Sequence, residues 1–112
     1  MIGRGSTQAW LERVLLALLL ARERYGLEIA GSVRDAWRAI GGGDTAWIPE
    51  GSTYAALRRL ERSGLLVGRW VDVGKDRPRR RYYALSPKGR RVAEADRTRQ
   101  TRSTRAITGI RP

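Results

Sequence analysis

The sequence predicts a small, mainly α-helical fold that carries one β-hairpin between its third and fourth helices. Three segments before residue 64 repeat apolar residues at helical spacing, whereas residues 65–85 read as two strands on either side of a turn. A Ser-Pro pair then marks the start of a last helix. The chain has 112 residues, of which 41% are hydrophobic, and this supplies one modest core. We expect one folded unit over residues 1–86, followed by a C-terminal helix and basic tail over residues 87–112.

The first helix is predicted to start at a cap formed by Ser6 or Thr7 and to run to about Arg24. Its apolar residues cover far more than one face, so it must be covered on more than one side. A second copy of the chain would do this, which predicts a homodimer; the alternative is a helix wrapped completely by its own domain. The apolar run Val14–Ala21 is too short to cross a bilayer, and we expect a cytoplasmic protein without membrane contact.

A second helix is expected over residues 27–40, where apolar residues recur at helical spacing after a Tyr-Gly break. A glycine-rich loop at residues 41–44 and an extended segment at residues 46–49 should lead from it to the next helix. Tryptophan is abundant for this length. We expect most of these rings in the core, and the alternative is a pocket between subunits for a small aromatic effector; the four residues are Trp10, Trp37, Trp47 and Trp70.

The third helix is predicted to start at Gly51 and Ser52, to run to about Ser63 and to end at Gly64. Its spacing predicts a buried face of Thr53, Ala56, Leu57 and Leu60. The opposite face carries a tyrosine and three arginines, which suits a helix that reads nucleic acid, although a merely solvated face is the alternative. The candidate DNA-binding residues on this face are Ser52, Tyr54, Ala55, Arg58, Arg59 and Arg62.

A β-hairpin is predicted to follow, with strands over residues 65–73 and 79–85 joined by a turn at residues 74–78. Its tip is basic, and the candidate DNA-binding residues here are Lys75, Arg77, Arg79 and Arg80. The last helix is expected to run from Pro87 to about Arg97. Residues 97–112 hold five arginines and no acid, so we expect a basic helical extension that frays into a tail. This tail acts either as an arm on DNA or as a dimerisation helix.

The charge distribution points to a polyanionic partner. Residues 1–56 carry 6 basic and 6 acidic side chains, whereas residues 57–112 carry 17 basic and 5 acidic ones, so the net charge of +12 lies entirely in the second half. Arginine makes up 21 of the 23 basic residues, and its planar fork suits phosphates and guanine edges. Double-stranded DNA is therefore the leading partner, against the alternative of a generally basic surface.

Composition argues against an enzyme. The chain has no Cys and no His, which removes thiolate ligands, the commonest metal ligand and the usual general base near neutral pH. The carboxylates are scattered along the sequence instead of clustered as a metal-dependent nuclease would need them. We expect no catalytic site, no metal and no cofactor.

Three helices, a hairpin and a fourth helix form the element order of a winged helix-turn-helix, in which one helix enters the major groove and the hairpin lies beside it. The segments IPEGSTYAALRRLERSGLLVGRW and RPRRRYYALSPKGR, with LLLARERYGLEIAGSV upstream, resemble the phenolic-acid-decarboxylase-regulator (PadR) family of bacterial transcription factors. This resemblance implies that Gly51–Leu57 opens the recognition helix. Here Thr53 stands where the family usually has Leu, and Ala55 where it usually has Pro.

The chain resembles the short-tailed branch of that family, because only about 25 residues follow Ser86. Many members dimerise through a long C-terminal helical region, so dimerisation here is expected to use the first helix, with Trp10, Val14 and Leu18 at the interface. The predicted function is a sequence-specific transcriptional regulator, a repressor that acts as a homodimer on a pseudo-palindromic operator. The alternative is a winged-helix protein that binds nucleic acid without sequence preference.

Overall fold

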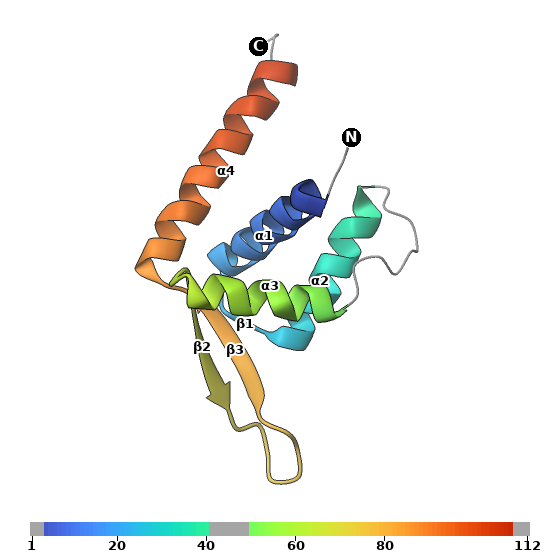
Figure 1. Cartoon of the computed structure of the whole chain (residues 1–112), viewed down its shortest axis with the longest axis vertical. Helices are drawn as coiled ribbons and strands as arrows, with labels where there is room; N and C mark the ends of the chain where they lie inside the picture. Colours follow the sequence, from blue (N-terminus) through green and yellow to red (C-terminus); the bar gives the residue numbers. More distant parts are fainter. Residues whose placement is uncertain (1–3, 41–49, 109–112) are drawn as a thin grey trace.

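The computed structural model describes residues 4–40 and 50–108, and the side chains of residues 8–40 and 51–99. Four helices and a three-stranded antiparallel sheet follow one another along the chain (Figure 1), which confirms the predicted fold class. The elements are α1 (Arg4–Ala21), β1 (Arg24–Tyr25), α2 (Gly26–Ala39), α3 (Glu50–Arg62), β2 (Leu66–Val71), β3 (Arg80–Leu85) and α4 (Pro87–Thr108). The predicted loop at 41–44, the extended segment at 46–49 and Trp47 lie outside the described residues.

The hydrophobic core lies where α1, α2 and α3 meet, with contributions from the sheet and α4. The predicted buried face of the third helix is confirmed, because each of its four residues is at most 4% exposed: Thr53, Ala56, Leu57 and Leu60. These pack against the leucines of α1 and the aliphatic residues of α2, namely Leu11, Leu15, Leu16, Leu19, Ile29 and Val33. Burial on this scale is the main favourable term that holds α3 in place.

The end of the first helix differs from the prediction. α1 stops at Ala21 instead of Arg24, and it begins at Arg4, so Ser6 and Thr7 lie inside the helix and do not precede it. The Nε of Arg24 donates a hydrogen bond of 3.0 Å to the carbonyl of Leu18, which satisfies one of the last carbonyls of the helix. Arg24 and Tyr25 then form β1, a strand that the sequence analysis missed.

The sheet has the order β1-β3-β2, and both neighbours of β3 run antiparallel to it. Arg24 of β1 pairs with Tyr83 of β3, and Leu66 of β2 pairs with Leu85. The β2–β3 hairpin, which we call the wing, projects away from the helices (Figure 1). Buried Leu66 and Tyr83 anchor its base in the core, whereas its outer half has no covering layer within the described chain.

The last helix is longer than predicted. The Ser86 hydroxyl caps α4 by accepting a hydrogen bond of 2.9 Å from the Gly89 N–H, and Pro87 occupies the first turn as expected. The helix runs to Thr108 instead of ending near Arg97, because no glycine or proline interrupts residues 90–108. Its buried Ala93 packs on α1, and none of the described helices is long and apolar enough to span a bilayer.

Candidate nucleic-acid interface

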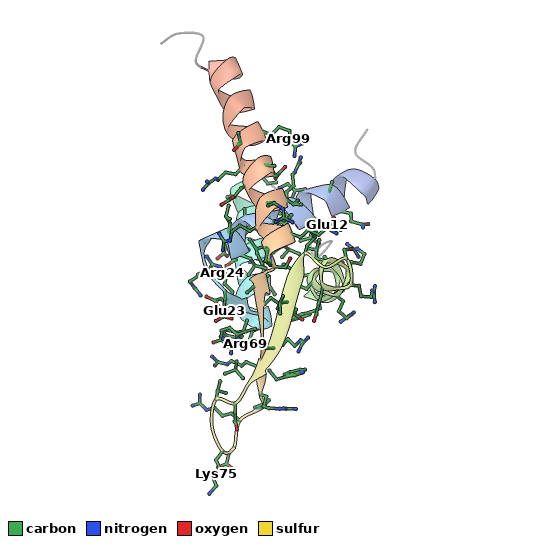
Figure 2. The ribbon with its side chains drawn as sticks, turned by 90° about the vertical axis from the view of Figure 1, so that its left-hand side faces the viewer. Glu12, Glu23, Arg24, Arg69, Lys75 and Arg99 are labelled. Atoms are coloured by element: carbon green, nitrogen blue, oxygen red, sulfur yellow. The ribbon has the colours of Figure 1, made fainter. Side chains whose placement is uncertain are left out.

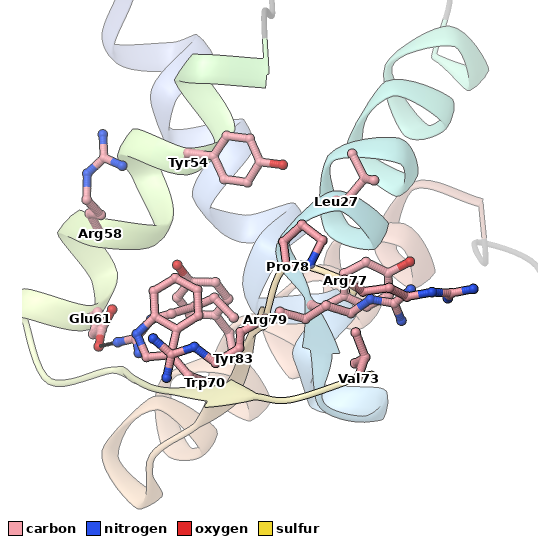
Figure 3. A pocket seen from close by; sticks show the side chains of 14 residues that line it. Leu27, Tyr54, Arg58, Glu61, Trp70, Val73, Arg77, Pro78, Arg79 and Tyr83 are labelled. Carbon is pink, nitrogen blue, oxygen red and sulfur yellow. Dashed lines mark hydrogen bonds and ion pairs between the residues drawn. The ribbon is translucent and has the colours of Figure 1, made fainter. Parts of the chain in front are cut away.

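The outward face of α3 presents the predicted recognition residues in two groups. Ser52, Arg58 and Arg62 are exposed, whereas Tyr54 and Ala55 are half-buried. Arg58 extends outward from the axis of α3 (Figure 3). An exposed guanidinium on this face has the reach and the planar donor fork that phosphates or guanine edges require.

Arg59 takes a different direction from its neighbour Arg58. Its Nη2 lies 3.2 Å from Oε2 of Glu12 on α1, and both side chains are about one-third exposed. This ion pair joins the recognition helix to α1 across 47 positions in the sequence. Helical spacing predicts Arg59 among the DNA-facing residues, because it carries no information about the Glu12 carboxylate on α1.

Tyr54 is positioned by a glycine. A Cβ atom at Gly26, the first residue of α2, would lie 2.8 Å from Cε1 of the Tyr54 ring, closer than real Cβ contacts allow. The missing side chain therefore lets the ring lie directly on the start of α2. Figure 3 shows the Tyr54 hydroxyl directed from α3 toward the helix that carries Leu27. Tyr54 thus helps to fix the angle between α2 and α3.

The wing carries the predicted basic residues at different depths. Lys75 lies at the far tip (Figure 2), and Arg77 and Arg79 are also exposed. Arg80 is half-buried, because its guanidinium lies 4.3 Å from the centroid of the Tyr25 ring on β1. This cation–π contact ties β1 to the outer end of β3 and leaves the tip as the more accessible cationic part.

A cluster between α3 and the wing sets the position of the hairpin. Arg81 donates from Nη2 to Oε2 of Glu61 at 2.7 Å, and its guanidinium lies 5.2 Å from the Trp70 ring centroid. A Cβ at Gly68 would stand 2.6 Å from Nη2 of Arg81, so a larger residue there would displace the Arg81 guanidinium from its place across β2. A glycine inside a strand is a sign of such a close approach, and it was available in the sequence.

A second set of ion pairs holds the β1 segment. Arg69 on β2 donates to Glu23 at 2.6 Å, and this hydrogen bond raises the pKa of Arg69. Arg22 pairs with Glu28 on α2, and the hydrogen bond from Arg22 is the largest cause that lowers the pKa of the Glu28 carboxyl below 4.5. The pair of Arg69 and Glu23 fastens the turn between α1 and α2 to the wing (Figure 2), and the pair of Arg22 and Glu28 fastens that turn to α2.

A groove of about 650 Å³ separates α3 from the wing (Figure 3). The start of α2 closes one end of it. Its walls combine aromatic and aliphatic side chains with arginines from three elements, including Leu27, Tyr54, Arg58, Trp70, Arg77 and Arg79. The structure therefore brings the predicted recognition helix and the predicted wing to one shared concave surface. Leu27 and Trp70 were not among the predicted site residues.

The predicted dimer residues lie on the other side of the molecule, on α1. Trp10, Val14 and Leu18 are half-buried within the single chain, and the Trp10 ring meets Trp37 edge to face at 5.5 Å. Trp10 and Val14 also line a hollow of about 340 Å³ between α1 and α4. Within the described residues, no three acidic side chains gather as a metal site would require.

Comparison with known proteins gives the family. The family model of the transcriptional regulator PadR-like family matches residues 15–95. An uncharacterized protein of Lysinibacillus sphaericus is 29% identical over 80 residues, which are 71% of this chain and 68% of that protein.

Two solved structures show the same fold. A PadR-like transcription factor of Bacteroides fragilis has a TM-score of 0.72 at 23% identity, over 96% of this chain and 95% of that one. A PadR-like transcriptional regulator of Bacillus cereus has a TM-score of 0.71 at 21% identity, over 95% of each chain. The matching family and both solved structures belong to transcription regulators, not to enzymes. Because the family model matches most of this chain, the chain belongs to the PadR-like family and is a DNA-binding transcriptional regulator.

Proposed function

We propose that the protein is a repressor that binds a pseudo-palindromic operator as a homodimer. The observation that carries this proposal is the shared cationic side of α3 and the wing. Its side chains are exposed, and no carboxylate of the described residues lies within ion-pair distance of them; they are Arg58, Arg62, Lys75, Arg77 and Arg79. Occupation of an operator by such a dimer would block transcription, in the cytoplasm where the DNA lies.

In this proposal α3 enters the major groove, and Ser52, Arg58 and Arg62 face the base edges and flanking phosphates. Tyr54 and Ala55 lie deeper and border the contact, and Arg59 holds α3 against α1. The wing tip lies along the sugar-phosphate backbone, where it adds affinity without reading sequence. Arg80 supports the outer end of β3 from its place on Tyr25.

The dimer is proposed to form through α1, with Trp10, Val14 and Leu18 facing the partner copy. These side chains retain exposed apolar surface, and a two-fold interface would bury it. The hollow between α1 and α4 would then lie at this interface, and Trp10 makes it the place where a small aromatic effector would bind.

Selection of bound fragments from random DNA with the purified protein, combined with light scattering, tests the proposal. We expect a dimer at micromolar concentration and a motif with two-fold symmetry whose half-sites lie about 10 base pairs apart. A monomer together with an asymmetric motif would overturn the dimeric mode. Enrichment of no motif, with equal affinity for bulk competitor DNA, would favour the non-specific binder instead.

A further inference from the structure

The groove between α3 and the wing has more positive charge than the chain itself neutralises. Glu61 is the one acid in its lining, and Arg81 already pairs with it at 2.7 Å. Arg58, Arg77 and Arg79 also line the groove, and the described part of the chain places no carboxylate within 4 Å of their guanidinium groups. Guanidinium groups without a carboxylate partner along one groove suit a ligand that carries several anionic oxygens.

The same groove exposes apolar surface that phosphate oxygens would not cover. Leu27 is 58% exposed and Trp70 is 56% exposed, and both belong to the lining. Tyr54 and Pro78 continue this surface between them (Figure 3). In duplex DNA the base faces are stacked on one another, so the backbone that passes the wing offers no flat apolar partner for these side chains.

We propose that this groove binds a free nucleoside phosphate, with the base against Leu27 and Trp70 and the phosphates on Arg58 and Arg79. The Arg79 guanidinium lies 5.4 Å from the centroid of the Trp70 ring, so the base would displace it from the ring toward the phosphates. A volume of about 650 Å³ lies within the usual range for small-ligand sites, ~300–1,000 Å³. The groove admits a single nucleotide, whereas a duplex is far too wide to enter it. A phosphate-bearing ring is the ligand class that satisfies both the arginines and the apolar wall.

Binding of the nucleotide and binding of the operator would exclude each other, and this consequence rests on the proposed function. Arg58 would serve both ligands, because it lines the groove and also lies on the outward face of α3. The site is separate from the α1–α4 hollow, which lies on the other side of α3 and shares no lining residue with the groove. The groove would therefore report nucleotide level directly at the DNA-contacting surface.

Calorimetric titration of the purified full chain with ADP, without DNA, tests the site itself. We expect ADP to bind at least tenfold more tightly than adenosine or pyrophosphate, because neither fragment engages both walls. Equal affinity for pyrophosphate and ADP would reduce the groove to an electrostatic patch and overturn the proposal. Equal affinity for 1-naphthoate, an aromatic monocarboxylate, would overturn the assignment to phosphates.

Substitutions in the lining of the groove test where ADP binds. Trp70→Ala should weaken ADP binding by about tenfold or more, in line with the loss of one base–aromatic stack. Leu27→Ala should weaken ADP binding several-fold and leave DNA affinity unchanged, because its side chain is outside the proposed DNA contacts. Val67→Ala is the matched control: Val67 is equally exposed on β2 but does not line the groove, so ADP affinity should not change. Equal effects of all three substitutions would contradict the assigned site.

Competition with DNA separates this proposal from the proposed function. The apparent ADP dissociation constant should rise in proportion to the concentration of added selected operator. DNA binding with no ADP binding would reject the groove site and leave the repressor proposal intact. ADP binding without any DNA binding would support the groove site and reject the repressor proposal. Simultaneous binding of ADP and DNA without competition would show that the two ligands do not overlap.

Discussion

At the scale of single residues, the structure separates side chains that the sequence treats alike. Arg58 and Arg59 are adjacent on α3, yet Arg58 is exposed and faces the groove, whereas Arg59 is paired with Glu12 of α1. The same division occurs on the wing, where Lys75 is exposed at the tip and Arg81 is held by Glu61. Side chains that already form an ion pair hold the helices and strands in position, and the remaining cationic side chains are available to bind DNA.

Arg58→Ala should therefore cost about 1–3 kcal/mol in operator binding and relax the base preference at one position of each half-site. Arg59→Ala should leave that preference unchanged and lower the free energy of unfolding by at most about 1 kcal/mol, as expected for a partly exposed ion pair. Titration of both variants against a panel of operator mutants checks this. Equal loss of base preference in the two variants would reject the distinction.

The wing tip should behave differently from α3. Lys75→Ala and Arg77→Ala are expected to weaken binding to all sequences about equally, because a hairpin tip meets phosphates. Each should also reduce the slope of log affinity against log salt by about 0.9 per lost phosphate contact. Affinities at several salt concentrations, for the operator and for a scrambled duplex, measure both effects. A changed sequence preference would assign base readout to the wing.

Glu28 makes stability depend on pH. Because Arg22 lowers the pKa of the Glu28 carboxyl in the folded chain, this group stabilises the fold above its ordinary pKa of 4.5. The contribution is lost as the pH falls through 4.5 toward the lowered pKa. Glu28→Gln should reduce the free energy of unfolding at pH 7 by about 0.2–1 kcal/mol, with the two curves converging in acid. Glu94→Gln is the control, since Glu94 is exposed and has no ion pair among the described residues.

At the scale of elements, glycines decide how closely neighbours approach. Gly89, on the first turns of α4, faces the backbone of the segment before β2, and a Cβ there would lie 1.9 Å from the Leu65 carbonyl oxygen. That oxygen also accepts a hydrogen bond of 3.0 Å from the Ser86 N–H. The start of α4 and the base of the wing are therefore in direct backbone contact, which fixes the helix on the sheet.

Substitution of two helical glycines by alanine should change the free energy of unfolding in opposite directions. Gly89→Ala is expected to lower the free energy of unfolding by about 1–3 kcal/mol or more, because backbone atoms cannot move aside cheaply. Gly31→Ala on α2 should raise it by about 0.5–1 kcal/mol, since its Cβ would meet only the Arg34 guanidinium, at 3.8 Å. Urea denaturation of both variants measures these values, and destabilisation of equal size in both would contradict the packing argument.

At the scale of the whole molecule, the cationic groove between α3 and the wing and the half-buried apolar residues of α1 lie on different sides. The half of the chain from residue 57 onward holds the entire net charge of +12 and forms the second half of α3, the wing and α4. The half-buried apolar residues of α1 lie away from the wing, beside α4 (Figure 1). A molecule divided in this way can present one face to DNA and another to a second copy. The division into a DNA-binding unit, 1–86, and a C-terminal helix with a basic tail, 87–112, stays a prediction.

Deletion of residues 98–112 should leave folding and sequence preference nearly intact, because the buried residues Gly89 and Ala93 of α4 precede the cut. Affinity for any DNA should fall, with the salt slope reduced by about 0.9 per lost phosphate contact. Light scattering and salt-dependent titrations compare the truncated and full chains. Conversion of a dimer to a monomer would instead show that the second half of α4 is a dimerisation helix.

The sequence by itself determined the order of the four helices and the hairpin, the buried face of α3, the basic tip of the hairpin and the location of the excess charge. These follow from local periodicity, turn residues and composition, which a single segment carries without reference to the rest of the chain. Only the tertiary structure decided that Arg24 and Tyr25 form a strand, because two residues have no periodicity and their pairing depends on β3. It also decided which arginines are paired and that Leu27 and Trp70 share a groove. Such contacts join positions far apart in sequence, such as Glu12 and Arg59, and the pattern within one segment does not contain them.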